Sequence, residues 1–277
     1  MNNFVKRTLS GALYVALVVV LTAFAPSLYF VLAFALLCMY AVREFHQLMQ
    51  SSRLQTILSS TAALLLFLLF AGKNAPEVMD TARLPFALIL YAVVIMAALV
   101  AELFSKVENP IYNWGKLLCA QVMIALPFAL MNFIMAENRF LMLALFVTIW
   151  VNDSGAYCVG CLMAKRKGGN HKMFPRVSPA KSWEGLIGGF VFALIAGYVF
   201  SLVGWIPDLA ISLLYALLIA VAGTFGDLME SLMKRTIGVK DSGRFLPGHG
   251  GILDRFDSLL LATPVVAIVL FFLSLAL

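Results

Sequence analysis

Long apolar blocks separated by short polar segments dominate the chain. A helix needs about 20 mainly apolar residues to cross the hydrocarbon core of a membrane, and nine blocks reach or approach that length. The pattern therefore predicts an all-α, polytopic integral membrane protein with about nine transmembrane helices. The predicted spans cover residues 8–25, 27–42, 55–72, 85–104, 114–134, 139–162, 185–204, 209–229 and 258–276.

The composition agrees with this pattern. Of the 277 residues, 62% are hydrophobic and 12% are charged, and the mean hydropathy is +0.97. Ordinary soluble domains are only about 45–50% apolar. The spans use up the length, so we expect a single membrane domain over residues 1–277. The first span follows Lys6-Arg7 like a signal peptide, but it lacks a convincing cleavage site, and we expect it to be retained.

The basic residues predict the orientation of the spans. If the N-terminus lies in the cytoplasm, all but Lys73, Arg83 and Arg139 of the 20 lysines and arginines fall in inner segments. This distribution follows the positive-inside rule, so we expect a cytoplasmic N-terminus and a C-terminus outside. The net charge of +6 is then explained by this bias and by contact with anionic lipids, and a nucleic-acid partner is not expected.

Charge is concentrated in the segment 227–257, between the last two spans. It holds five of the 14 acidic residues, and charge so close to a bilayer is costly and usually functional. The segment begins as a continuation of the preceding helix. Helical spacing places Asp227, Glu230, Ser231 and Lys234 on one polar face.

A glycine-rich loop follows, and Asp254 and Asp257 share a helical face where the last span begins. If the two helices lie side by side, Asp227, Asp254 and Asp257 meet at their cytoplasmic ends. Carboxylates beside lysine and arginine are typical of a Mg²⁺ site that holds a phosphate. Helix capping is the alternative; it explains Asp254 alone but not Asp227, which lies inside a helical pattern.

Two further features lie in the second half of the chain. Asp153 interrupts an apolar run and needs a partner, a ligand or water there, so we expect it to act in a polar cavity. A structural pair with a base is the alternative, and Lys181 or Lys234 could be the partner. After a basic loop, Ser182 is expected to cap the next helix. Gly185 begins a small-residue spacing typical of close helix packing.

The first half carries little chemistry. The group Arg43-Glu44-Phe45-His46 ends the second span, and we interpret it as an interfacial cap. Glu102 is expected either to face a cavity or to reach toward the interface. Cys158 and Cys161 form a single CxxC without the second pair that a zinc site needs, so we interpret them as apolar helix residues.

Two blocks of sequence resemble the phosphatidate cytidylyltransferase (CDP-diacylglycerol synthase) family. The resemblance extends over the C-terminal half, from about Trp150. The shorter block is Ser178-Pro179-x-Lys181-Ser182-x-Glu184-Gly185. The longer block is Ser231-x-x-Lys234-Arg235-x4-Lys240-Asp241-x-Gly243-x-x-Leu246-Pro247-Gly248-His249-Gly250-Gly251-Ile252-x-Asp254-Arg255-Phe256-Asp257.

The resemblance implies a nucleotidyltransferase. The phosphate of phosphatidic acid would attack the α-phosphorus of CTP, giving CDP-diacylglycerol and pyrophosphate with the help of Mg²⁺, with or without a second cation. Residues 136–277 would hold the catalytic spans and loops, and residues 1–135 would hold mainly structural spans.

The resemblance also implies roles for individual residues. The expected catalytic residues are Asp227, Lys234, Asp254 and Asp257, of which the three aspartates hold the metal. The expected nucleotide-binding residues are Arg235, Lys240, Asp241, Gly248, His249, Gly250, Gly251 and Arg255. The expected phosphatidate-binding residues are Ser178, Lys181, Ser182 and Asp153.

The expected partners are CTP, phosphatidic acid and membrane lipids, and a homodimer is left open. The short chain without a targeting extension favours a bacterial inner membrane, with the site facing the cytoplasm. An organelle or endoplasmic reticulum membrane is the alternative.

Two other classes of protein remain as alternatives. A secondary transporter for an anionic substrate also has intramembrane acids and broken helices, but its halves should repeat, whereas here the charge lies in the second half. The other class is a different lipid-phosphate enzyme, such as a CDP-alcohol phosphotransferase, whose closely spaced aspartate motif is not in this sequence, or a polyprenyl-phosphate sugar transferase.

Overall fold

The structure is a computed structural model, and it describes residues 3–105, 108–166, 169–243 and 250–276. The chain divides into two compact units. The N-terminal unit comprises Met1–Glu137 together with Asp241–Phe256, and the C-terminal unit comprises Asn138–Lys240 together with Asp257–Leu277. Both units are therefore built from two separate stretches of sequence.

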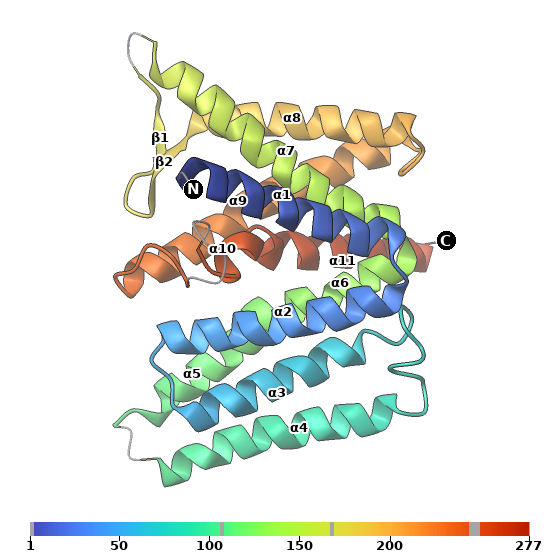
Figure 1. Cartoon of the computed structure of the whole chain (residues 1–277), viewed down its shortest axis with the longest axis vertical. Helices are drawn as coiled ribbons and strands as arrows, with labels where there is room; N and C mark the ends of the chain where they lie inside the picture. Colours follow the sequence, from blue (N-terminus) through green and yellow to red (C-terminus); the bar gives the residue numbers. More distant parts are fainter. Residues whose placement is uncertain (1–2, 106–107, 167–168, 244–249, 277) are drawn as a thin grey trace. The chain divides into compact units, whose positions relative to one another are not determined.

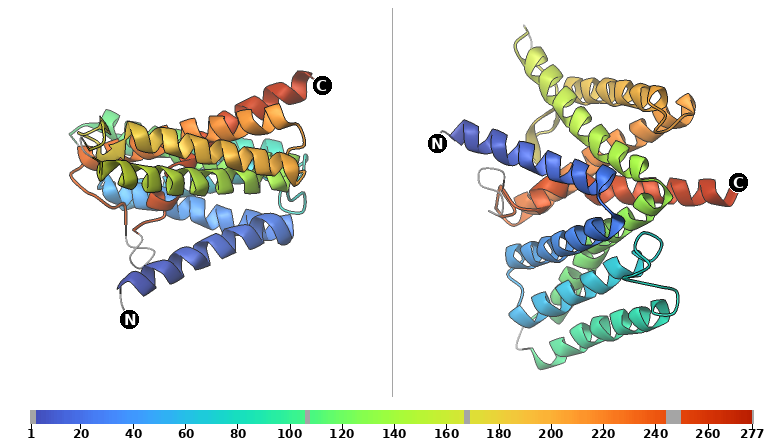
Figure 2. Two further views of the ribbon diagram at one scale, coloured as in Figure 1. Left: turned by 90° about the horizontal axis from the view of Figure 1, so that it is seen from above. Right: turned by 45° about the vertical axis from the view of Figure 1, so that its right-hand side comes forward.

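The N-terminal unit consists of helices. In Figure 1 and in the right-hand view of Figure 2, α2, α3 and α4 follow one another as neighbours in chain order. Its elements are α1 (Asn3–Val19), η1 (Val20–Phe24), α2 (Ser27–Leu48), α3 (Arg53–Leu69), α4 (Leu84–Ala101), η2 (Glu102–Phe104), α5 (Pro110–Ala120), η3 (Gln121–Ala125), α6 (Leu126–Glu137) and the short α10 (Leu253–Phe256).

Aromatic packing joins the distant segment α10 to the first helices. Phe256 is buried, and its ring lies 5.9 Å from that of Tyr14, 6.0 Å from Phe34 and 5.1 Å from Phe128, measured between centroids. Large buried rings contribute most to such a core. Phe256 therefore anchors α10 among helices that precede it by more than a hundred positions.

Polar side chains also join the helices of this unit. Gln121 Nε2 donates to the backbone oxygen and hydroxyl of Ser59 at 3.0 and 3.1 Å. Glu102 is buried and accepts hydrogen bonds from Asn113 Nδ2 and Ser105 Oγ, both at 2.9 Å. Hydrogen bonds of this kind hold helices together where apolar surroundings give little driving force for association. Glu102, at the end of α4, therefore links this helix to α5 and has a structural role.

The C-terminal unit contains four long helices and a small hairpin. Figure 1 shows the hairpin at one end of α7 and α8. Ser182 caps α8 as predicted, because its hydroxyl accepts from the Gly185 N–H at 3.1 Å. The elements are α7 (Arg139–Ala164), β1 (Lys172–Phe174), β2 (Ser178–Ser182), α8 (Trp183–Leu202), α9 (Leu209–Thr236) and α11 (Leu259–Ala276).

The hairpin is the one departure from an all-helical chain within the described residues. Strands β1 and β2 are antiparallel, with Lys172 opposite Ser182 and Phe174 opposite Ser178. Pro179 has no N–H for a helix and biases Ser178 toward extended backbone. The strands are too short to give an alternating pattern, so the sequence pattern did not reveal them.

Glycine brings α7 and α8 into close contact, as the spacing of Gly185 and Gly189 predicted. A Cβ added at Gly185 would lie 2.9 Å from the backbone oxygen of Ala156. One added at Gly189 would lie 2.7 Å from Asn152 Oδ1 and 2.9 Å from the Asn152 backbone oxygen. Small residues of this kind allow helix backbones to approach in membranes.

Helices occupy all nine predicted stretches. Within the described residues, six helices are long and apolar enough to cross a membrane: Ser27–Leu48, Leu84–Phe104, Pro110–Glu137, Arg139–Ala164, Trp183–Leu202 and Leu209–Thr236. The apolar helices Thr8–Phe24, Arg53–Leu69 and Leu259–Leu273 are shorter. The count of nine spans and the placement of the termini stay predictions.

Candidate active site

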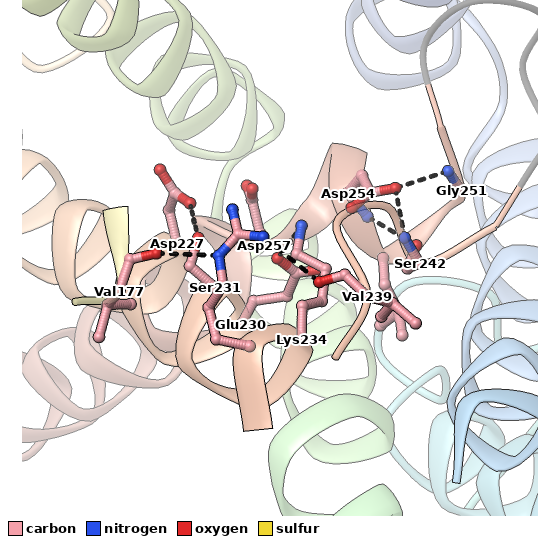
Figure 3. Close-up of polar contacts among 12 residues, drawn as sticks. Val177, Asp227, Glu230, Ser231, Lys234, Val239, Ser242, Gly251, Asp254 and Asp257 are labelled. Atoms are coloured by element: carbon pink, nitrogen blue, oxygen red, sulfur yellow. Dashed lines mark hydrogen bonds and ion pairs between the residues drawn. The ribbon is translucent and has the colours of Figure 1, made fainter. Parts of the chain in front are cut away.

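Three carboxylates converge within the C-terminal unit (Figure 3). Asp227 and Glu230 lie one helical turn apart on α9, and Asp257 precedes α11; one oxygen of each lies within 4.8 Å of the others. Gly226 makes this approach possible. A Cβ there would lie 2.7 Å from the backbone oxygen of Asp257 and 3.0 Å from that of Ser258.

The electrostatics of this acidic cluster, Asp227, Glu230 and Asp257, favour a cation. Burial of Asp257, reinforced by the negative charges of Asp227 and Glu230, raises its pKa well above the usual range. Two lysines partly balance the cluster: Lys181 Nζ lies 2.7 Å from Asp227 Oδ2, and Lys234 Nζ lies 2.5 Å from Glu230 Oε2. Three carboxylates against two ammonium groups leave an excess of negative charge. Oxygen ligands of this kind suit a hard divalent cation such as Mg²⁺.

A cavity of about 490 Å³ adjoins this cluster within the same unit. Residues of α7, β1, β2, α8 and α9 line it, and Asp227 and Lys181 belong to its wall. The cavity therefore shares Asp227 with the acidic cluster. Its other polar lining includes Asn152, Asp153, Asn170, Lys172, Ser182 and Thr224.

The wall formed by α7 carries two of these polar groups. Asp153 is exposed and is one of the residues that line the cavity. Asn152 beside it is buried, and its Oδ1 finds no hydrogen-bond donor among the described residues. Its Nδ2 donates to Asp153 Oδ1 at 3.4 Å. Of the two lysines considered as partners for Asp153, Lys181 forms its ion pair with Asp227 and Lys234 forms its ion pair with Glu230.

The hairpin that brings Lys172 and Lys181 to the cavity is fixed at its base. The backbone N–H of His171 donates to both carboxylate oxygens of Glu184, at 3.1 and 3.0 Å, and His171 Nδ1 lies 2.5 Å from Glu184 Oε1. Asn170 Nδ2 donates to the Gly160 backbone oxygen at 3.2 Å. Both contacts tie the loop before β1 to the ends of α7 and α8.

The two serines predicted to bind phosphatidate have different places. Ser182 lines the cavity, but its hydroxyl caps α8. Ser178 pairs with Phe174 in the hairpin and is not among the described residues that line the cavity. The lysine of this block is therefore better placed than its serines to meet a ligand.

The predicted nucleotide-binding residues are divided between the two units. In the C-terminal unit, Arg235 Nε donates to the backbone oxygen of Val177 at 3.2 Å, and Lys240 is exposed. Asp241, Gly250, Gly251 and Arg255 belong to the N-terminal unit. Gly248 and His249 lie outside the described residues.

Asp254 also belongs to the N-terminal unit, where it shapes the loop that precedes it. Its Oδ2 accepts hydrogen bonds from the backbone N–H of Ser242 at 2.9 Å and of Gly251 at 2.8 Å (Figure 3). The acidic cluster of the described residues contains Glu230 in the place expected for Asp254.

Two carboxylates with many contacts in the structure, Glu230 and Glu44, were not among the predicted site residues. Glu230 was placed on the polar face of α9, three residues after Asp227, and that spacing was the available signal. Glu44 was interpreted as an interfacial cap, and this is wrong: its side chain is buried and accepts hydrogen bonds from Leu253 and Ser242. The only sequence signal for Glu44 was a carboxylate within an apolar helix.

Comparison with known proteins shows a match to the Cytidylyltransferase family over residues 5–273. The chain belongs to this family. A relative from Bacillus subtilis (strain 168), named phosphatidate cytidylyltransferase, is 51% identical over 119 residues, which cover 43% of this chain and 42% of the relative. One from Haemophilus influenzae with the same name is 43% identical over 142 residues, covering 49% of this chain and 47% of the relative. The chain thus spans about half the length of the curated relatives it matches.

Proposed function

We propose that this member of the cytidylyltransferase family is a phosphatidate cytidylyltransferase of a bacterial inner membrane, with its site facing the cytoplasm. An oxygen of the phosphatidate phosphate forms a bond to the α-phosphorus of CTP, and the bond from that phosphorus to the α–β bridging oxygen breaks. The products are CDP-diacylglycerol and pyrophosphate. The observation that carries the proposal is Asp227, which belongs both to the acidic cluster and to the wall of a cavity that contains lysines.

The acidic cluster fits a divalent cation through its chemistry. Asp227, Glu230 and Asp257 would hold Mg²⁺, which when bound neutralises triphosphate charge and stabilises the charge that develops as pyrophosphate leaves. The family motif also makes Asp254 a candidate ligand, so the test includes Asp254→Asn. No protein nucleophile is needed, because a phosphate monoester is itself a competent nucleophile near neutral pH.

Lys181 is placed to respond to the ligands. Its ammonium group lies 2.7 Å from Asp227 Oδ2 and also 3.4 Å from the Thr224 backbone oxygen. With a cation at Asp227, the attraction between Lys181 and that carboxylate would be weaker, and the Lys181 ammonium group would be available to the lipid phosphate in the cavity. Lys172, on the facing strand of the hairpin, adds a second positive charge to the same wall.

The remaining predicted residues would bind the nucleotide. Lys234, Arg235, Lys240 and Arg255 offer positive charge for the triphosphate, and Gly250 offers a backbone N–H group. Gly251 belongs to this set through the motif, and its own N–H donates to Asp254. Asp241 would orient Lys240 or contact the cytidine. Gly248 and His249 are included in this set only because they belong to the family motif. The two acyl chains stay in the bilayer while the headgroup occupies the cavity.

The test is CTP-dependent pyrophosphate release by detergent-purified protein, with and without phosphatidate and with and without Mg²⁺. We expect release only when lipid and metal are both present. Asp227→Asn should lower kcat by at least about a hundredfold, because one charge-stabilising ligand is worth several kcal/mol in such a site. Asp254→Asn measured beside it tells whether the motif aspartate acts at the metal or in the loop.

The outcomes distinguish the roles of Asp227 and Asp254, and they also test the proposed reaction itself. A metal ligand shows a raised Mg²⁺ requirement when it is replaced, whereas a loop-shaping residue shows a raised KM for CTP at unchanged Mg²⁺ requirement. Folded wild-type protein that releases no pyrophosphate with any lipid phosphate would refute the proposal. Transport of an anionic substrate would then be the activity to measure.

A further inference from the structure

A buried carboxylate on α2 ties the end of the chain to its beginning. The side chain of Glu44 is buried, with a residue exposure of 3%. Its Oε2 accepts a hydrogen bond from the Leu253 N–H at 2.8 Å and another from Ser242 Oγ at 3.1 Å. These partners follow it by 209 and 198 positions in the sequence. Because an isolated carboxylate is costly in an apolar helix, these bonds explain how it is tolerated.

Ser242 extends this contact to Asp254. The Ser242 hydroxyl donates to Glu44 and accepts from the Asp254 N–H at 3.4 Å, while the Ser242 N–H donates to Asp254 Oδ2 at 2.9 Å. Gly251 N–H donates to the same Asp254 oxygen at 2.8 Å. Glu44, Ser242 and Asp254 thus form a hydrogen-bond network. It joins two described parts of the longer family block, residues 242–243 and 250–254, which we call the motif segment.

The glycines of the segment fit around this network. A Cβ at either Gly243 or Gly251 would overlap Glu44 Oε1, and one at Gly251 would also overlap Ser242 Oγ. Gly250 adopts a positive φ of 80°, and a Cβ there would overlap Asp254 Oδ2. The absence of side chains at these positions lets the backbone close onto two buried carboxylates.

We propose that Glu44 is a positioning residue for the nucleotide. It touches neither substrate nor metal; it acts by holding the backbone around the described residues Gly250, Gly251 and Arg255, which belong to the proposed nucleotide-binding set. This inference rests on the proposed function, and it gives a residue of the second helix a part in binding the nucleotide. Loss of the Glu44 carboxylate should therefore weaken binding of CTP more than binding of phosphatidate.

Glu102 provides a matched control. It lies in the same unit, is buried to a similar extent at 6% exposure, and likewise accepts two hydrogen bonds. Its partners, Ser105 and Asn113, belong to the region of α4 and α5 rather than to the motif segment. A purely structural loss should affect Glu102→Ala and Glu44→Ala alike.

The experiment compares steady-state kinetics and thermal stability of the full-length variants in detergent. Glu44→Ala should raise the KM for CTP by about tenfold or more, because two buried donors lose their shared acceptor. The KM for phosphatidate should change by less than about twofold. Glu44→Gln keeps a carbonyl oxygen that can accept both bonds, so it should restore the KM for CTP to within about threefold of wild type. Glu102→Ala should lower the Tm without raising the KM for CTP.

Ser242→Ala tests the same network if Glu44→Ala does not fold. It removes one hydroxyl and keeps the Glu44–Leu253 bond, so the KM for CTP should rise by about threefold or more. Accelerated tryptic cleavage between residues 235 and 255, relative to Glu102→Ala, would show the loosened segment without reference to activity.

The results distinguish the two levels of the proposal. Wild-type protein without CTP-dependent pyrophosphate release overturns the proposed function. Active wild-type protein whose KM for CTP is unchanged in both Glu44→Ala and Ser242→Ala overturns the inference about Glu44 alone. An equal rise in the KM for CTP in Glu44→Ala and Glu102→Ala also overturns it.

Discussion

A single methyl group at Gly189 tests how closely α7 and α8 must pack. Gly189 is buried on α8, and a Cβ there would lie 2.9 Å from the backbone oxygen of Asn152 and 3.2 Å from the Ala156 Cβ. Ordinary contacts begin at 3.4 Å. Because the Asn152 oxygen belongs to the backbone of α7, no rotamer change relieves the overlap, and the helices must separate by about half an ångström for Gly189→Ala.

The expected loss follows from two opposing effects. Inserting a methyl group into a packed contact costs about 1–3 kcal/mol. Replacing glycine within a helix by alanine returns about 0.5–1 kcal/mol. The net loss is then about 1 kcal/mol and at most about 2.5 kcal/mol, which lowers the Tm by roughly 2–4 °C and by at most about 10 °C in a protein of this size. Activity should fall as well, because both helices line the cavity.

Gly160→Ala is the matched control for this variant. Gly160 lies on α7 and also lines the cavity, but its added Cβ would meet Ser182 Oγ at 3.5 Å, an ordinary contact distance. We expect this variant to be as stable as wild type or slightly more stable. Thermal unfolding in detergent, followed by tryptophan fluorescence, measures both proteins, and pyrophosphate release measures their activity.

The comparison has a clear opposing result. If Gly189→Ala unfolds at the same temperature as Gly160→Ala, the contact between α7 and α8 is not as close as the structure has it. The glycine spacing would then reflect something other than helix packing. A loss of activity in Gly189→Ala at unchanged Tm would instead locate its effect in the shape of the cavity.

Two further predictions concern the cavity and the cluster. Lys181→Met should raise the KM for phosphatidate by about tenfold and the KM for CTP by less, since one charged hydrogen bond to phosphate is lost. Lys165→Met, which removes an exposed basic residue, should change neither KM. An equal rise in both KM values in Lys181→Met would refute a specific role in lipid binding. Mg²⁺ at about a hundred times its Kd should stabilise wild-type protein by about 2.7 kcal/mol. This stabilisation should disappear in Asp257→Asn but persist in Asp208→Asn, which changes the exposed residue that caps the start of α9. Its persistence in Asp257→Asn would exclude Asp257 as a ligand.

Features determined by near neighbours in the sequence were predictable. The apolar periodicity located helices at all nine stretches, and the Ser182 cap depends only on the Gly185 N–H three residues later. The spacing of Gly185 and Gly189 likewise describes one face of one helix. In each case the physical cause lies within about one turn of the residue concerned.

Features that depend on how distant segments meet were not predictable. The meeting of Asp227 and Asp257 was predicted only on the condition that their two helices lie side by side. Gly226 allows the backbone near Asp257 to lie against α9, and a helical wheel does not show that approach. The choice between Glu230 and Asp254 as the third member of the cluster depends on the same register. The burial of Glu44 depends on Leu253, and one sequence alone offers no signal that the two residues touch.

The contact between Glu44 and Leu253 has a consequence for how the protein is made. Ribosomes add about 5–20 residues per second, so roughly 10–40 s pass between the synthesis of Glu44 and that of its partner 209 positions later. During that interval α2 carries a carboxylate whose lasting hydrogen-bond donors do not yet exist. The nascent helix must keep this group in water or beside temporary donors, and a chain that stops before residue 242 never buries it properly. Because of the hydrogen bond between Glu44 and Leu253, the first part of the chain cannot finish folding until the last part has been made.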